Sequence, residues 1–445
     1  MKKIIAVFLS AVLALSFAGC TPKEYEGFRV YDSQGAEIAV IKSLPLDSAK
    51  LSDPLLAAYI DIAFAEAAEA ISAEQRVSLE KAEKILLGGY GIWTNLDSSF
   101  YSAIKGALNE GEDLQLGCAV TNLNGALIAA YSAGEEGRNF AAMRTQPYSS
   151  LKPLAIYMQG IEDGKINYSS AYMDSPIKTV TNAEGAASDW PSNADGKYLN
   201  KDVAMSYAIK RSLNTVAVRC LTDIGLENSV DYLINKLGMP LEFEAERIKN
   251  VGAEEVVGSV ALGYIYNGVS PVDMAGYYQC FANGGKYAEP TAVRKICDKS
   301  GRLIFENKAE PEQLIKPETA FIMNSLLQKV VSPEGTGAKA AIKGVPAGGK
   351  TGTGENGNWF VGFTPQYSCA VWHGSGLGKN NAAQMFANIM SSAESDKNMK
   401  YPSCDKVRQA LYCKVSGGLV SAGCAEAEMG YYISDNLPEK CKIHS

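Results

Sequence analysis

Ser149 and Lys152 stand three residues apart in the segment Pro147–Pro153. On a helix this spacing puts both side chains on one face, so Ser149 Oγ and Lys152 Nζ can meet. A serine hydroxyl is a weak nucleophile until an adjacent base takes its proton. A lysine can be that base when burial or a nearby cation lowers its pKa. The pair indicates nucleophilic catalysis, with Ser150 pointing elsewhere; an ordinary helix surface is the alternative.

Two further groups could complete such a site. Ser212 and Asn214 supply a hydroxyl and an amide on one short segment, although a simple helix cap would look the same. The run Lys350–Thr353 (Lys-Thr-Gly-Thr) follows two glycines and leads into an expected strand. Each group alone is a weak signal. The three in this order resemble the signature of the penicillin-recognising serine enzymes.

The resemblance extends to the transpeptidase module of class A, bifunctional penicillin-binding proteins. It covers roughly Leu86 to His444. It is carried, beside the three motifs, by Gly89–Asp97, Ser212–Arg219, Phe281–Gly285, Gly335–Gly337 and Trp359–Pro365. The implied fold is α+β, an antiparallel sheet flanked by helices with a helical subdomain. In one departure, Tyr148 replaces the usual glycine before the nucleophile, and glycine tolerates backbone angles that tyrosine does not.

The resemblance implies a role for each motif residue. Ser149 would be the acyl-accepting nucleophile and Lys152 its base, kept neutral in part by the cation Lys350. Ser212 would relay a proton to the leaving amine. Asn214 would bind the substrate amide and orient Lys152.

The third motif would hold the substrate. Lys350 would attract the terminal carboxylate, the hydroxyls of Thr351 and Thr353 would bind it, and Gly352 would permit close backbone approach. The oxyanion hole would be the backbone N–H groups of Ser149 and Thr353. Trp359 and Phe360 are expected in the core rather than against substrate.

The implied reaction is acyl transfer in peptidoglycan cross-linking. Ser149 would attack the D-Ala-D-Ala bond of a stem peptide, and an amine from a neighbouring stem would take the acyl group. A β-lactam would mimic the same bond. Water as acceptor gives a D,D-carboxypeptidase. A β-lactamase would need a carboxylate to activate water, and no Glu-x-x-Leu-Asn run lies between Asn214 and Lys350. The alternative from a non-enzymatic class of function is a non-catalytic penicillin-binding scaffold of wall synthesis.

Composition narrows the other possibilities. The chain has 445 residues, a net charge of −7 and two histidines, His373 and His444. The acidic balance argues against a nucleic-acid partner, and the scarcity of histidine disfavours a Ser-His-Asp triad. No cofactor is expected. Residues 1–20 read as a signal peptide whose ending, Ala18-Gly19-Cys20, resembles a lipobox with Cys20 lipidated. This predicts a bacterial protein held by a lipid on the extracytoplasmic face of the membrane.

Four segments follow from these patterns: the signal peptide, a tether and helical linker over 21–85, the transpeptidase domain over 86–400, and a cysteine-containing tail over 401–445. The segment before the match is too short for a glycosyltransferase module, so a separate glycosyltransferase partner is expected. The expected elements include helices at Leu55–Ile71 and from Ser72 to Leu87, a hairpin at Leu114–Tyr131, a loop over the site at Thr179–Tyr198, and strands at Lys350–Thr353, Trp359–Thr364 and Tyr367–His373.

Cysteines divide into two groups. Five lie singly in apolar or mixed stretches and are expected as buried small hydrophobes: Cys118, Cys220, Cys280, Cys297 and Cys369. Four crowd the tail: Cys404, Cys413, Cys424 and Cys441. In an exported protein disulfides are the default for such a cluster. A zinc site of Cys413, Cys424, Cys441 and His444 is the alternative, although the spacing matches no tight metal signature.

Overall fold

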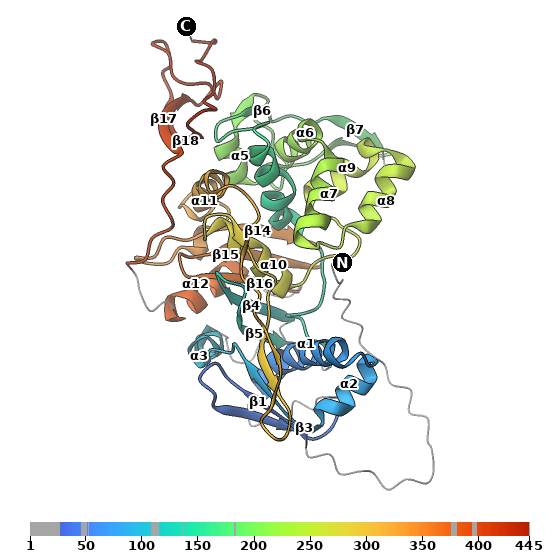
Figure 1. Ribbon diagram of the computed structural model, residues 1–445. Coiled ribbons are helices and arrows are strands. Elements are labelled where there is room, and N and C mark those ends of the chain that lie inside the picture. The colour runs from blue at the N-terminus through green and yellow to red at the C-terminus, as the bar shows by residue number, and fades with distance from the viewer. Residues whose placement is uncertain are drawn as a thin grey trace.

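The computed structural model describes residues 27–45, 51, 53–107, 115–135, 137–181, 184–374, 381–393 and 398–444. The predicted leader and Cys20 lie outside these residues. Figure 1 shows an elongated molecule with a small sheet at one end, a central sheet, a helical region above it, and the tail at the far end. Helices combine with antiparallel sheets, so the expected α+β class is confirmed. Among the described residues, no helix is long and apolar enough to cross a membrane.

The central sheet has five strands in the order β14-β15-β16-β4-β5, every neighbouring pair antiparallel. Its strands are β4 (Leu116–Asn122), β5 (Leu127–Ala133), β14 (Gly348–Gly354), β15 (Gly357–Phe363) and β16 (Tyr367–His373). These include the predicted hairpin and the three predicted C-terminal strands.

Alternating side chains bury both faces of this sheet. Phe360 belongs to the core shared with α3 (Ser98–Ala107) and α12 (Asn381–Ala393), and its ring lies 4.9 Å from that of Phe386. Trp359 belongs to the opposite core, which includes α10 (Pro271–Tyr278) and α11 (Pro317–Val331). Both aromatic residues are buried, as predicted.

The helical region surrounds the segment that contains Ser149. Its helices are η3 (Tyr148–Leu151), the π-helix η4 (Pro153–Met158), α4 (Gln159–Glu162), α5 (Met205–Arg211), α6 (Asn214–Ile224), α7 (Leu226–Leu237), α8 (Glu242–Val251) and α9 (Ala253–Leu262). Two small antiparallel ribbons join it: β6 (Ala171–Met173) with β9 (Asp202–Ala204), and β7 (Lys178–Thr181) with β8 (Ala187–Trp190). Short elements elsewhere are η5 (Gln279–Phe281), η6 (Ala338–Ala340), β10 (Lys286–Tyr287) and β13 (Glu312–Gln313).

The end below the central sheet is a second five-stranded sheet, ordered β12-β11-β3-β1-β2. It is built from β1 (Gly27–Tyr31), β2 (Glu37–Ile41), β3 (Gly88–Thr94), β11 (Val293–Cys297) and β12 (Leu303–Glu306). It is accompanied by η2 (Pro54–Leu56), α1 (Ala57–Gln75) and α2 (Leu79–Leu86). The described part of the expected tether is therefore packed into a sheet, because β1 and β2 pair with each other and β1 also pairs with β3.

One helix start was predicted at the wrong serine. Asp53 caps the first helical turn as expected, by accepting from the Leu55 N–H. Ser72 does not open a second helix, since α1 runs on to Gln75 and ends where Arg76 takes a left-handed conformation. The cap of α2 is Ser78, whose side chain accepts from the Lys81 N–H. Ser72 lies in the last turn of α1, where its hydroxyl donates to the Val77 carbonyl at 2.7 Å instead of capping a new helix.

The tail is the ribbon of β17 (Val407–Cys413) and β18 (Ala427–Ile433), which packs beside α11 (Figure 1). Tyr412 OH lies 2.7 Å from Ser206 Oγ on α5. Tyr432 OH donates to Ser169 Oγ at 2.8 Å. These buried contacts attach the tail to the helical region.

Glu66 bonds α1 to the start of β11, and its burial makes the stability of the fold depend on pH. Its carboxylate accepts the N–H groups of Ala292 at 2.6 Å and Val293 at 3.2 Å. Burial raises the pKa of Glu66 from 4.5 to about 8. The folded state therefore binds more protons between these values, and stability falls as pH rises. We expect Glu66→Gln to gain stability over wild type by up to about 1.4 kcal/mol per pH unit across this window.

The measurement is the free energy of unfolding in denaturant at several pH values. Glu74→Gln, on the exposed face of the same helix, is the matched control and should follow wild type. A constant difference between Glu66→Gln and wild type at every pH would contradict the assignment.

Candidate active site

The segment with Ser149 is a tight turn that leads into a buried helix. The Lys152 N–H donates to the Ser149 carbonyl, and Pro153, which has no N–H, begins the π-helix. Ser150 Oγ donates to the Pro147 carbonyl at 2.6 Å, and Tyr278 OH donates to the Ser150 carbonyl at 2.6 Å. Ser150 therefore faces the core, as predicted, while Ser149 is partly exposed.

Tyr148, just before the nucleophile candidate, adopts φ of 50°, in the left-handed region. A residue with a Cβ pays roughly 1–2 kcal/mol for this conformation, so the surroundings must hold it. Its N–H donates to the Gly263 carbonyl at 3.1 Å, and its ring lies 5.4 Å from that of Tyr264. A Cβ on Gly263 would lie 1.9 Å from the Tyr148 carbonyl oxygen. Tyrosine thus keeps a conformation that favours glycine, because Gly263 lets the two backbones touch.

Lys152 is completely buried and reaches the second motif. Its Nζ donates to Asn214 Oδ1 at 2.6 Å and to the Ser212 carbonyl at 3.1 Å. Burial, with a smaller contribution from the charge of Lys350, holds the pKa of Lys152 well below its usual 10.5. The burial and the neighbouring cation required of a lysine base are therefore both present.

Lys350 projects from β14 to the other side of Ser212. Its Nζ donates to Ser212 Oγ at 2.8 Å and to the Thr351 carbonyl at 3.0 Å. Burial lowers the pKa of Lys350 to about 7. Ser212 therefore lies between two lysines, accepting from Lys152 through its carbonyl and from Lys350 through its hydroxyl.

β14 passes directly beside the turn. A Cβ on Gly352 would lie 2.4 Å from the Pro147 carbonyl oxygen and 3.2 Å from the Ser150 nitrogen. Only glycine permits this approach. Thr351 Oγ1 donates to Thr336 Oγ1 at 2.9 Å, and Thr353 is exposed at the strand end.

The predicted residues thus come together. Lys152, Ser212, Asn214 and Lys350 form one hydrogen-bonded network, and Ser149 and the segment Thr351–Thr353 lie on the adjoining backbones. The one histidine of the central sheet, His373, bonds its own neighbour: its Nδ1 lies 2.9 Å from the Gly374 carbonyl oxygen.

Three residues that hold Asn214 were missed by sequence reasoning. The Asn214 side-chain amide donates to the Ser192 carbonyl at 2.7 Å, which leaves Oδ1 to face Lys152. The Asn214 N–H donates to Asn193 Oδ1 at 2.8 Å. Asn193 in turn donates to the buried carboxylate of Asp174 at 2.8 Å. For Ser192 and Asn193 the sequence signal was the polar composition of the stretch expected as a loop over the site, and Asp174 lies before that stretch.

That stretch is more ordered than predicted. Its first part is the β7–β8 ribbon, and its second part is the turn at Ser192 and Asn193, which supports Asn214. A pocket lies between the ribbon and α9, lined in part by Lys178, Trp190 and Tyr264. Since the Tyr264 ring also contacts Tyr148, the pocket opens close to the turn of Ser149.

Comparison with known proteins identifies the class. Residues 119–391, more than half of the chain, match the family described as the penicillin-binding protein transpeptidase domain. The chain belongs to this family, and its curated relatives include class A penicillin-binding proteins.

Two curated relatives show the extent of the similarity. Penicillin-binding protein 1A of Clostridium botulinum is 33% identical over 279 residues, which are 60% of this chain and 32% of that protein. Penicillin-binding protein 1F of Bacillus subtilis is 33% identical over 355 residues, which are 75% of this chain and 45% of that protein. The chain spans about a third to a half of the length of such relatives.

Solved structures support the fold. The D,D-transpeptidase domain of a peptidoglycan glycosyltransferase from Eggerthella lenta superposes with a TM-score of 0.63 at 20% identity, over 83% of this chain and 98% of that one. Penicillin-binding protein 1A from Haemophilus influenzae gives a TM-score of 0.67 at 16% identity, over 94% of this chain and 99% of that one. The transpeptidase-like fold expected from the sequence is confirmed.

The contact between Gly263 and Tyr148 generates a prediction for the nucleophile turn. Gly263→Ala adds a Cβ that would collide with the Tyr148 backbone, at a φ of 77° that already disfavours a side chain. We expect a loss of more than ~2 kcal/mol in the free energy of unfolding, measured in denaturant.

Gly238→Ala provides a matched control. Its φ is 65°, yet its Cβ would have no neighbour within 4 Å, so it should cost only about 1 kcal/mol. Equal losses in the two variants would show that Gly263 is needed for its backbone angle alone and would remove the steric argument.

Proposed function

We propose that the protein is a serine-type D,D-transpeptidase that cross-links peptidoglycan stem peptides ending in D-Ala-D-Ala. The observation that supports this best is the burial of Lys152 between Ser212, Asn214 and the neighbouring Lys350. A lysine on a surface would stay protonated at neutral pH, whereas this lysine can accept a proton. The family and the intact motifs support the same reaction class.

In the proposed reaction, Ser149 Oγ attacks the carbonyl carbon of the penultimate D-Ala while Lys152 takes the hydroxyl proton. The N–H groups of Ser149 and Thr353 would stabilise the oxyanion, at roughly 3–4 kcal/mol each. The tetrahedral intermediate then collapses, the peptide C–N bond breaks, and D-alanine leaves with a proton relayed through Ser212. An amine from a second stem attacks the acyl-enzyme, and Ser149 recovers its proton.

Lys350 would recognise the terminal carboxylate of the donor stem. Since burial lowers its pKa to about 7, the free protein holds it only partly charged near neutrality. An incoming carboxylate raises the pKa of a nearby lysine and would complete its charge. The hydroxyls of Thr351 and Thr353 would bind the same carboxylate.

Two carboxylates next to the site bear on the β-lactamase alternative. Asp174 accepts from Asn193, Thr215 and the Leu199 N–H, so its oxygens are occupied. Glu334 pairs with Lys210 at 2.6 Å. Because both of these carboxylates have partners, neither is a free base for activating water. The balance between a transpeptidase and a carboxypeptidase depends on the acceptor, amine or water.

The cellular setting follows from the sequence alone. A lipid on Cys20 would hold the domain at the outer face of the bacterial membrane, next to its substrate. Because the transpeptidase step acts on polymerised glycan, a separate glycosyltransferase would supply the strands.

The first test is covalent labelling by penicillin. Intact mass after incubation should show a stable adduct of one drug per chain on wild type. Ser149→Ala should show none, with a fall of at least about 10⁴-fold in acylation rate because the nucleophile is gone. Ser150→Ala, which removes the neighbouring core-facing hydroxyl, is the matched control and should keep the adduct.

Two outcomes would overturn the proposal. If no adduct forms and the drug stays intact, the protein is a non-catalytic scaffold. If no adduct forms and the drug is hydrolysed, the protein is a β-lactamase.

The second test uses pH. Acylation requires neutral Lys152, so the rate constant for acylation at saturating β-lactam should rise with pH through the pKa of Lys152. Lys350→Gln removes the neighbouring cation, which raises the pKa of Lys152. We therefore expect the acid limb of the variant's pH profile to move to higher pH. Lys343→Gln, at an exposed position, should leave it in place. If the acid limb of the Lys350→Gln pH profile lies at the same pH as in wild type, or at lower pH, the result would argue against Lys152 as the base.

A further inference from the structure

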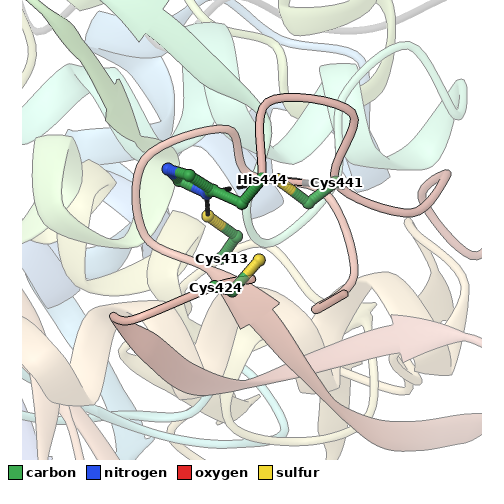
Figure 2. A group of neighbouring side chains, drawn as sticks. All are labelled: Cys413, Cys424, Cys441 and His444. Atoms are coloured by element: carbon green, nitrogen blue, oxygen red, sulfur yellow. Dashed lines mark hydrogen bonds between the residues drawn. The ribbon is translucent and has the colours of Figure 1, made fainter. Parts of the chain in front are cut away.

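Four side chains that can bind a metal meet in the tail, away from the proposed active site. Figure 2 shows Cys413, Cys424, Cys441 and His444 turned toward one another. One ligand atom from each, three Sγ and one imidazole nitrogen, lie within 4.8 Å of each other. Cys413 and Cys441 are buried, and the other two are half-buried. The group is therefore partly shielded from solvent.

The spacing of these atoms fits a tetrahedral metal site. His444 Nδ1 lies 3.3 Å from Cys413 Sγ and 3.5 Å from Cys441 Sγ. A zinc ion with bonds of about 2.3 Å to sulfur and 2.0–2.1 Å to nitrogen separates tetrahedral S and N ligands by about 3.6 Å. The observed distances agree with this value.

The four ligands come from three separate pieces of backbone. Cys413 ends β17, Cys424 lies in the connection to β18, and Cys441 and His444 lie in the segment after β18. Two glycines let these pieces approach: a Cβ on Gly423 would lie 2.4 Å from the His444 carbonyl oxygen, and one on Gly418 would lie 2.9 Å from the Glu439 carbonyl oxygen.

Ser421 joins the same backbones around the ligand atoms. Its N–H donates to Cys424 Sγ at 3.4 Å. Its hydroxyl bonds the carbonyls of Cys441 at 3.1 Å and His444 at 3.2 Å. Such outer contacts orient metal ligands and are typical of structural sites.

The disulfides expected from the sequence do not form here. All nine described cysteines are free, and Cys404 lies outside the cluster. A disulfide would use two of the three clustered thiols and leave the third thiol and the imidazole unexplained. A metal uses all four. The five cysteines predicted as buried single residues are indeed buried.

We propose that Cys413, Cys424, Cys441 and His444 bind one Zn²⁺ ion. Three thiolates and one neutral imidazole are a soft donor set that zinc prefers over hard cations. Binding releases the three thiol protons to solvent and gives a complex with a net charge of −1. With four protein ligands no position is open for water, so the site is structural rather than catalytic.

The position of the site gives it a consequence for the fold. Cys413 directly follows Tyr412, which reaches Ser206 on α5, and α5 ends at the residue before Ser212. Gly417, in the loop that the ion would close, accepts from Ser169 Oγ at 2.6 Å. The metal would therefore hold the tail against the helix that precedes the second motif.

The test is metal content of the full-length chain, purified under nitrogen and dialysed without added metal. Elemental analysis by mass spectrometry should find about one zinc ion per protein chain. Cobalt replacement should give the strong visible absorption of tetrahedral cobalt thiolates. Cys441→Ser should retain less than about a tenth of the zinc. Cys404→Ser, a cysteine of the same tail outside the cluster, should retain all of it.

The cobalt spectrum of wild type needs no variant, so a misfolded Cys441→Ser protein would not spoil the test. If no zinc is found and the mass of the chain before reduction is lower by two hydrogens, the cluster contains a disulfide and the zinc proposal is wrong. No zinc with free thiols and no cobalt absorption would also overturn the proposal. Penicillin labelling at Ser149, followed in the same samples, reports separately on the proposed enzyme activity.

Discussion

The burial of two lysines around one serine is the constraint on which the rest of the structure depends. Removing an ammonium group from water is costly, and two such groups also repel each other. Lys152 bonds the Ser212 carbonyl and the Asn214 amide, and Lys350 bonds the Ser212 hydroxyl and the Thr351 carbonyl. Among the residues that the structure describes, no carboxylate bonds either amine. The result is a site that tolerates neutral lysine, which acyl transfer with a lysine base requires.

Building this site needs tight backbone contacts between distant segments. Lys350 reaches Ser212 across 138 residues of chain, and the edge strand that carries it touches the turn of Ser149 at Gly352. Tyr148 and Ser212 both take left-handed conformations, which are uncommon for residues with a Cβ. Strain of this kind persists where the surroundings enforce it and is frequent at functional sites.

The parts far from the motifs act as supports. Helix α1 bonds the second sheet at the start of β11 through Glu66, and it bonds the central sheet through Tyr59, whose hydroxyl donates to the Leu127 carbonyl at 2.7 Å. The tail bonds α5 through Tyr412 from the other end. The helix before Ser212 is thereby held on the side away from the central sheet. A metal in the tail would be a further support of this kind, because it would fix a short ribbon that could not form a core of its own.

The sequence by itself indicated the residues of the three motifs and most of the regular elements. The three motifs, the alternation that buries Trp359 and Phe360, and the Asp53 cap act over a few residues, so local patterns reveal them. Only the tertiary structure decided the rest. The hydroxyl of Ser72 bonds the Val77 carbonyl in the last turn of α1 and caps no new helix. Asp174 and Asn193 hold Asn214 because β-ribbons and turns bring them there. Three of the four tail cysteines converge with His444 instead of pairing. Such meetings depend on the relative placement of segments far apart in the chain, which spacing and composition do not record.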